Sequence, residues 1–154
     1  MKLNYILIPI YAFLVATIGG WLTNTGMDWY KTIKLPSFTP PGAIIGAVWT
    51  TIFILSAISA LIVWNMALHN NRFWLIIGIF ILNGIINVTW SLLFFNQHFL
   101  FTSIIDAAFI GVSVIALILL IWPLSRPASF LLFPYAGWVS FATYLNYLIW
   151  TLNK

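Results

Sequence analysis

The chain has 154 residues, of which 63% are hydrophobic and only 5% are charged. Soluble domains carry about 25% charged residues, so this composition excludes a soluble globular protein and indicates an integral membrane protein. The net charge of +4 comes from six scattered Lys and Arg residues, which form no basic patch for nucleic acid. The chain has no Cys, and His69 and His98 fall in separate predicted loops, so we expect no disulfide and no metal site.

Five apolar runs are each long enough to cross a bilayer. They cover about residues 5–22, 41–67, 73–95, 99–122 and 128–152. The last three connections are short, which forces neighbouring helices to run antiparallel. The sequence therefore predicts a multi-pass, all-α membrane protein: one domain over residues 1–154, built as a bundle of five transmembrane helices with the termini on opposite faces.

Small residues recur on one face of the first run. Ala12, Ala16 and Gly20 are four residues apart, and Gly42 and Gly46 repeat this spacing at the start of the second run. Such faces let helices approach closely, so both are candidate dimer faces. The charged residues do not orient the chain, because three cations fall on each side. They are Lys2, Arg72 and Arg126 on one side and Lys31, Lys34 and Lys154 on the other.

The long polar segment over residues 23–40 ends in Thr39-Pro40-Pro41. Two prolines in a row favour a helix start, with Thr39 as its N-cap. Trp29 and Ile33 fit one side of a short amphipathic turn on the surface, or else serve as interface anchors. We expect this segment to cover the start of the second span.

Polar residues within spans cost free energy, so each needs a reason. Asn83 and Asn87 share one helix face, which Trp90 continues. They fit either an aromatic cavity, with Trp49 and Trp138 as walls, or hydrogen bonds that join helices.

The chain contains few residues that could take part in catalysis. Asp106 is the only acidic residue in any span, and we expect a structural, hydrogen-bonded carboxyl group. The fifth span contains Pro134, which predicts a mid-span kink. No catalytic triad, carboxylate pair or phosphate-binding loop is present, so conventional hydrolytic or redox-cofactor catalysis is not expected.

Four motifs occur in order along the chain: PSFTPPG followed by Trp49, Asn87-Val-Thr-Trp90 followed by Phe94-Phe95, Asp106, and Pro134-Tyr135 with Trp138, Phe141-Ala142-Thr143 and Leu145-Asn146. Together they resemble the TspO/MBR family, the tryptophan-rich sensory proteins related to the mitochondrial translocator protein. The resemblance implies a five-helix bundle, commonly a homodimer. It also implies a pocket beneath the first loop that binds tetrapyrroles, such as protoporphyrin IX or haem, and benzodiazepine- or isoquinoline-type ligands, without a required cofactor.

Residue by residue, the resemblance implies a ligand site formed by Trp29, Tyr30, Pro40, Trp49, Asn83, Asn87, Trp138, Ala142 and Leu145. The leading hypothesis is therefore a membrane receptor for tetrapyrroles. One alternative is light-dependent porphyrin degradation, in which Trp49 and Trp138 are reactants, and another is porphyrin transport.

The sequence departs from the family pattern at several positions. Phe53 stands where many relatives have Tyr, and Phe38 replaces a frequent Trp. After Tyr147, Thr151 occupies the position where the sterol-recognition pattern needs a cation, and Lys154 comes one residue too late. We therefore do not expect specific sterol binding, which fits a bacterial cell membrane.

Overall fold

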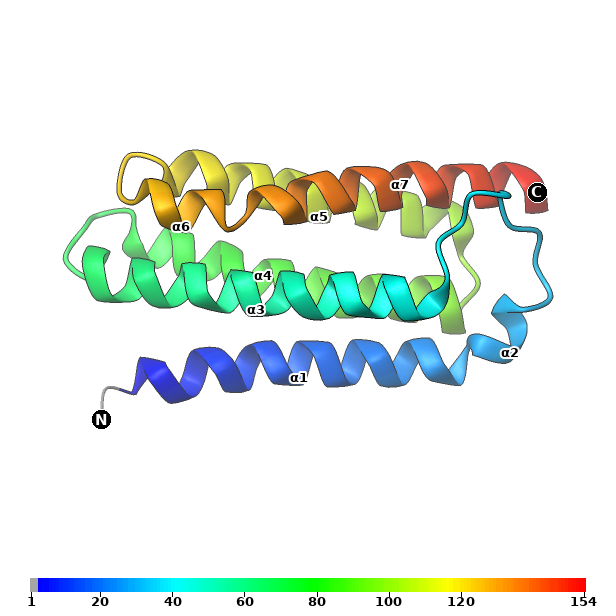
Figure 1. Ribbon diagram of the computed structural model, residues 1–154, viewed down its shortest axis with the longest axis horizontal. Helices are drawn as coiled ribbons and strands as arrows, with labels where there is room; N and C mark the ends of the chain where they lie inside the picture. The colour runs from blue at the N-terminus through cyan, green and yellow to red at the C-terminus, as the bar shows by residue number, and fades with distance from the viewer. Residues whose placement is uncertain (1–2) are drawn as a thin grey trace.

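The computed structural model describes residues 3–154, so the predicted contribution of Lys2 lies outside the described residues. The chain forms helices throughout (Figure 1). In order these are α1 (Asn4–Thr25), α2 (Met27–Tyr30), α3 (Gly42–Ala67), α4 (Phe73–Ser91), η1 (Leu92–Asn96), α5 (Leu100–Ile121), α6 (Arg126–Phe130) and α7 (Phe133–Asn153).

Five of these segments are long and apolar enough to cross a membrane, with α4 running into η1 and α6 into α7 as single spans. The predicted bundle of five transmembrane helices is confirmed. Large apolar side chains such as Phe13, Trp74 and Leu119 are about two-thirds exposed on the outside of the bundle, as expected where lipid is the solvent. The chain is a multi-pass integral membrane protein.

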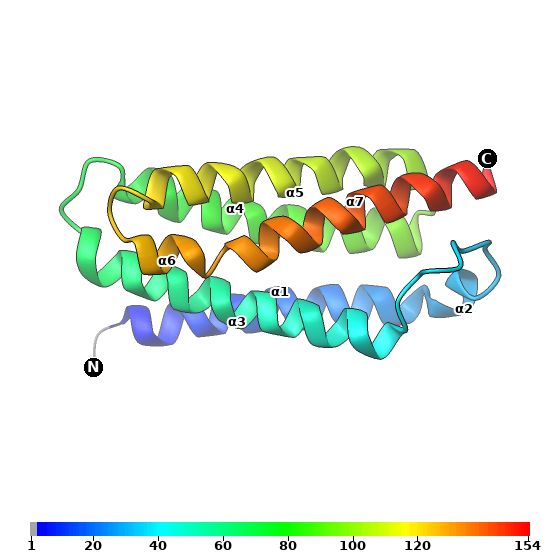
Figure 2. The same ribbon diagram turned by 45° about the horizontal axis from the view of Figure 1, so that its top comes forward.

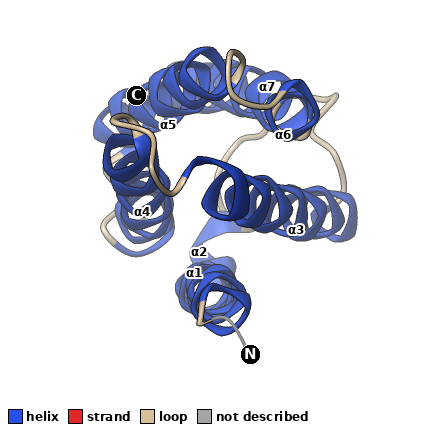
Figure 3. Ribbon diagram, turned by 90° about the vertical axis from the view of Figure 1, so that its left-hand side faces the viewer, coloured by secondary structure: helices blue, strands red, loops and turns tan. Residues whose placement is uncertain are grey.

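Seen end-on, α1, α4, α5, α7 and α3 follow one another around the bundle (Figure 3). The helix α5 packs against both α4 and α7, while α1 contacts both α3 and α4. A buried apolar cluster that includes Phe73, Ile76 and Leu117 fills the end near α6. A second cluster around Phe94, Phe95 and Ile149 lies at the α2 end.

The fifth span is broken, which differs from the mid-span kink predicted at Pro134. The helix α6 ends at Phe130, and α7 starts again at Phe133, with Pro134 in its first turn. The reason is that proline has no N–H to continue a helix but fits its first positions. The Ser59 hydroxyl donates to the Ala128 carbonyl at 2.8 Å and ties α3 to α6. Beyond the break α7 diverges from α3 (Figure 2).

The start of the second span also differs from its prediction. The helix α3 begins at Gly42, and Pro41, with an extended ψ of 143°, is its N-cap. The Thr39 hydroxyl donates to the Pro36 carbonyl at 2.7 Å within a turn, so Thr39 is not the N-cap. Because two consecutive prolines restrict the backbone before them to extended conformations, the helix starts after the pair.

The end of the third span is a π-helix, η1, which the sequence did not indicate. Its backbone lies directly against α1, because a Cβ atom at Gly26 would overlap the Phe95 carbonyl group. Single π-helical turns are rare and occur often at functional sites. Here the wider turn carries Phe94 and Phe95.

Candidate functional site

A cavity of about 310 Å³ lies inside the bundle at the α2 end. This volume is near the lower limit for small-molecule sites. Residues from α1, α2, α3, α4, η1 and α7 line it. The cavity thus lies between the two helices that the α6–α7 break separates.

Aromatic rings line the cavity on several sides. Trp49 stacks on Phe53 at a centroid distance of 5.7 Å, and Trp90 stacks on Phe94 at 5.3 Å. On the α7 side, Trp138 lies 5.5 Å from Phe141. Rings arranged around an apolar space suit a flat ligand, because aromatic faces stack favourably on other π-systems.

The α1 side of the cavity consists of small residues. Ala16, Gly19 and Gly20 line it there, and Gly42 and Gly46 line it on α3. Both small-residue faces that the sequence offered as dimer candidates therefore line the cavity, with the exception of Ala12. Their small size leaves space for the cavity.

The segment after α1 covers the end of the cavity. Met27 and Tyr30 of α2 line it, and Trp29 stacks on His98 at 4.0 Å. Burial raises the pKa of the Tyr30 phenol above its usual value of 10.0, so its hydroxyl group is neutral at physiological pH. The predicted surface turn is thus a short helix docked on the bundle.

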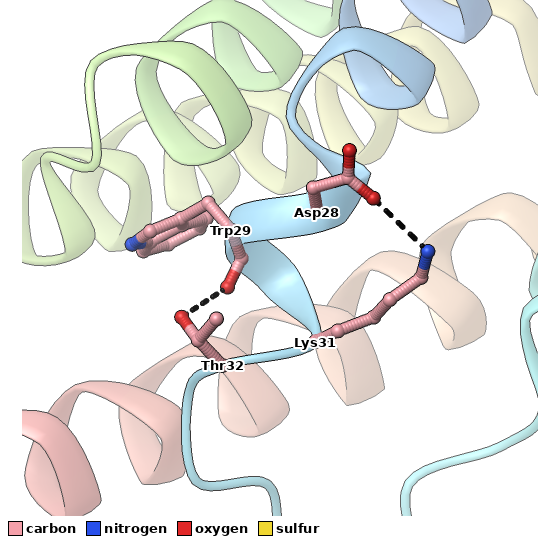
Figure 4. A network of polar contacts seen from close by, with 4 residues as sticks. All are labelled: Asp28, Trp29, Lys31 and Thr32. Atoms are coloured by element: carbon pink, nitrogen blue, oxygen red, sulfur yellow. Dashed lines mark hydrogen bonds and ion pairs between the residues drawn. The ribbon is translucent and has the colours of Figure 1, made fainter.

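Polar contacts occur within this cover and between the cover and α7. In α2 the Lys31 ammonium group lies 3.1 Å from the Asp28 carboxylate, and Thr32 donates to the Trp29 carbonyl (Figure 4). Further along, the Asn153 side chain at the end of α7 accepts from the Lys34 backbone N–H and donates to the Lys34 carbonyl, both at 2.9 Å. The side chain of Asn153 therefore ties the loop to α7.

A buried polar network joins α4, α5 and α7. The Tyr135 hydroxyl donates to Asn83 at 2.8 Å and accepts from the Asn87 amide at 2.6 Å, and the Asn83 amide donates to the Ser113 hydroxyl at 2.8 Å. Asn87 also lines the cavity. Its carbonyl oxygen accepts no hydrogen bond from residues 3–154. Asn83 therefore serves helix packing, whereas Asn87 serves both packing and the cavity.

Comparison with known proteins agrees with this arrangement. Residues 6–151 match the TspO/MBR family. The chain belongs to the TspO/MBR family. It is 32% identical to tryptophan-rich protein TspO of Bacillus cereus, over 99% of both chains. It is 35% identical to tryptophan-rich protein TspO of Archaeoglobus fulgidus, again over 99% of both chains, and 26% identical to the translocator protein of Sus scrofa, over 96% of this chain and 91% of that protein.

In this TspO/MBR chain, six of the nine residues predicted for the ligand site line the cavity: Tyr30, Trp49, Asn87, Trp138, Ala142 and Leu145. The other three are not in its lining. Trp29 stacks on His98, Pro40 lies in the loop before α3, and Asn83 lies within the polar network. Contact of these nine residues with a ligand stays a prediction.

Several lining residues were missing from the prediction. The aromatic ones are Phe53, Trp90, Phe94, Phe95 and Phe141, and α1 contributes Val15, Ala16, Gly19, Gly20 and Thr23. The Trp90 position could have been included, because it shares a helix face with Asn87. The α1 residues could not, since an apolar helix with small residues offers no sign of what its faces contact.

Asp106 of α5 differs from the hydrogen-bonded carboxyl group that we expected. Its side chain is half-buried, and no hydrogen bond to it is found within the described part of the chain. The same holds for the Trp90 and Trp138 indole N–H groups and for the Asn146 amide nitrogen. Among residues 3–154 no three His, Asp or Glu side chains are grouped to hold a metal ion.

Proposed function

We propose that this chain is a membrane receptor that binds tetrapyrroles such as protoporphyrin IX, and benzodiazepine- or isoquinoline-type ligands, in the cavity at the α2 end. The observation that carries the proposal is the aromatic wall of Trp49, Trp90 and Trp138 around an apolar space. The macrocycle stacks on these rings, while the Asn87 carbonyl accepts a hydrogen bond from its polar centre or edge. The Lys34 side chain is exposed near this end and attracts anionic ligand groups, an effect that salt weakens.

The test is a titration of the purified protein with protoporphyrin IX in the dark, followed by quenching of tryptophan fluorescence. Trp49→Ala and Trp138→Ala each remove one stacking surface worth about 1 kcal/mol, so we expect affinity to fall about fivefold. Trp74→Ala is the matched control, because Trp74 is 70% exposed on the outside of the bundle.

Saturable quenching near one porphyrin per chain, weakened only in the two cavity variants, would support the proposal. Linear quenching that never saturates, alike in all four proteins, would mean that the porphyrin merely partitions into detergent. The receptor proposal would then fail.

A second candidate function is light-dependent breakdown of the bound porphyrin. It is favoured by three indole rings beside the cavity, because an excited porphyrin can take an electron from an adjacent indole. The variant Trp49→Phe with Trp138→Phe keeps aromatic walls that are harder to oxidise. Binding retained with loss of the light-driven absorbance decay would support this activity, whereas equal decay in both proteins would exclude a role for these two residues.

A further inference from the structure

The cavity is open on the side where α1 faces α3. Gly20 of α1 and Gly42, Gly46 and Thr50 of α3 line it, and all four are exposed. Both helices are apolar spans, so the surface of these residues that lies outside the cavity faces lipid. These four residues, which we call the slot residues, therefore form an edge between the cavity and the bilayer.

The two sides of this edge face each other across the antiparallel pair. The Asn4 amide donates to the Asn65 side chain at 3.3 Å, which fixes the level of α1 against α3. Counting equally from this pair, with the same rise per residue on both helices, places Gly20 level with Trp49, the residue before Thr50. It places Gly46 level with Thr23. Each of these two glycines thus lies level with a cavity-lining residue of the other helix.

The slot glycines have no packing role in the structure. A Cβ atom added at Gly20, Gly42 or Gly46 would meet nothing within 4 Å. At Gly26 and Gly84, by contrast, an added Cβ atom would overlap Phe95 and Tyr11. A glycine within a helix costs about 1 kcal/mol relative to alanine. The slot glycines therefore leave the edge of the cavity free of side chains.

The polar end of the cavity is closed, in contrast to its side. The helix α2 docks there through the Trp29–His98 stack, and Asn153 holds the backbone of Lys34 on both its N–H and its carbonyl. Inside, Asn87 is only 6% exposed and has a carbonyl oxygen that no group within residues 3–154 engages. The cavity therefore presents an unused acceptor to a ligand, and its unobstructed side faces lipid.

We propose that flat apolar ligands enter this cavity sideways from the bilayer, between α1 and α3, through the slot kept open by Gly20, Gly42 and Gly46. The inference rests on the proposed function and adds the route by which a ligand reaches the cavity. The ligands are then compounds that partition into the hydrocarbon of the bilayer before they bind. The loop over residues 31–41 acts as a fixed cover and does not have to open for binding.

The test measures the association rate of protoporphyrin IX with the protein in lipid nanodiscs that hold one chain each, by stopped-flow quenching of tryptophan fluorescence. Gly20→Leu and Gly46→Leu place an isobutyl group in the slot, and we expect association to slow about tenfold, with dissociation slowed as well. Gly78→Leu is the matched control, because Gly78 is an exposed glycine of α4 with nothing within 4 Å that does not line the cavity. Asn153→Ala, which releases the cover, should leave the association rate unchanged.

Other results would overturn the proposal. Wild-type rates in both slot variants, or faster association in Asn153→Ala, would place the route beneath the loop, while saturable binding in the same experiment would leave the receptor function standing. If Gly20→Leu slows association only where two chains share a disc, the slot is an interface between copies and not a route. If the wild-type protein shows no saturable binding, the receptor function and the slot fail together.

Discussion

Tyr135 is the residue on which the buried polar network depends. Its hydroxyl group is at once the donor to Asn83 and the acceptor from Asn87. In Tyr135→Phe both amides lose a partner in the apolar interior. Hydrogen bonds between membrane helices are worth about 0.6–2 kcal/mol each, so the loss of two should lower the free energy of unfolding by about 1–4 kcal/mol. Unfolding in mixed micelles with a denaturing detergent measures this change.

Tyr144→Phe is the matched control for this substitution. Tyr144 is on the same helix, is 55% exposed, and has no hydrogen bond from its hydroxyl group among the described residues. Equal stability of the two variants would contradict the assigned role of the Tyr135 hydroxyl. Porphyrin affinity is expected to change in Tyr135→Phe alone, because Asn87 is then free to turn away from the cavity.

The sequence could place residues on a helix face but not choose their partners. The spacing of Asn83 and Asn87 predicted a shared face. Both interpretations of that face, a cavity wall and hydrogen bonds between helices, are correct in part. One turn of helix separates an amide buried in the network from an amide at the cavity. Which of the two meets the cavity depends on where α7 diverges from α3, and no local pattern carries this information.

The docking of α1 depends on one close approach to α4. The Tyr11 hydroxyl of α1 donates to the Ile81 carbonyl of α4, and Gly84 leaves the space for the Tyr11 ring. In Gly84→Ala the new methyl group would overlap this ring, so we expect a loss of about 1–3 kcal/mol from overpacking. Thermal unfolding in detergent, with Gly78→Ala as the control, measures it. Because the control only improves helix propensity, it should not destabilise, and equal destabilisation of both would refute the close approach.

The loop after α2 lies beside the end of α7 (Figure 1). Within residues 3–154, the hydrogen bonds between these two segments are those that the Asn153 side chain makes with the Lys34 backbone. Asn153→Ala removes two hydrogen bonds worth about 1 kcal/mol each, so the released state of the loop should become at least about fivefold more populated. Limited trypsin digestion, which cuts after Lys31 and Lys34, measures this population. Asn71→Ala, in the exposed loop between α3 and α4, is the control. Unchanged cleavage after Asn153→Ala would show that other contacts hold the loop.

At the scale of elements, hydropathy predicted five spans because lipid demands long apolar helices and little else. Because the five spans are uniformly apolar, their hydropathy did not indicate where a helix breaks or changes to a π-helix. Pro134 indicated a disturbance in the fifth span but not that the chain would break before it and restart. The π-helix η1 could not be predicted from the sequence, since Leu92–Asn96 is as apolar as the turns before it.

At the scale of the molecule, the cavity results from how the helices are joined. The Ser59–Ala128 contact holds α3 against α6, while α7 leaves α3 beyond the break. The space between them is bounded by α1 with its small residues and by α2 across the end. Spacing suggested an aromatic cavity between Trp49 and Trp138, but most of the predicted lining came from family resemblance, because the shape of a site formed by six segments arises from the divergence of two helices and not from a motif.

This arrangement predicts that a ligand stabilises the whole bundle. A ligand in the cavity contacts α1, α3, α4 and α7 together and binds the folded state only. At a concentration of one hundred times the dissociation constant, it should add about 2.7 kcal/mol to the free energy of unfolding. We expect protoporphyrin IX to raise the melting temperature of the wild-type protein in detergent by several degrees. The rise should be smaller in Trp49→Ala and Trp138→Ala and unaltered in Trp74→Ala. A porphyrin that merely partitions into the micelle would shift all four proteins equally or not at all, so a uniform response would contradict binding within the bundle.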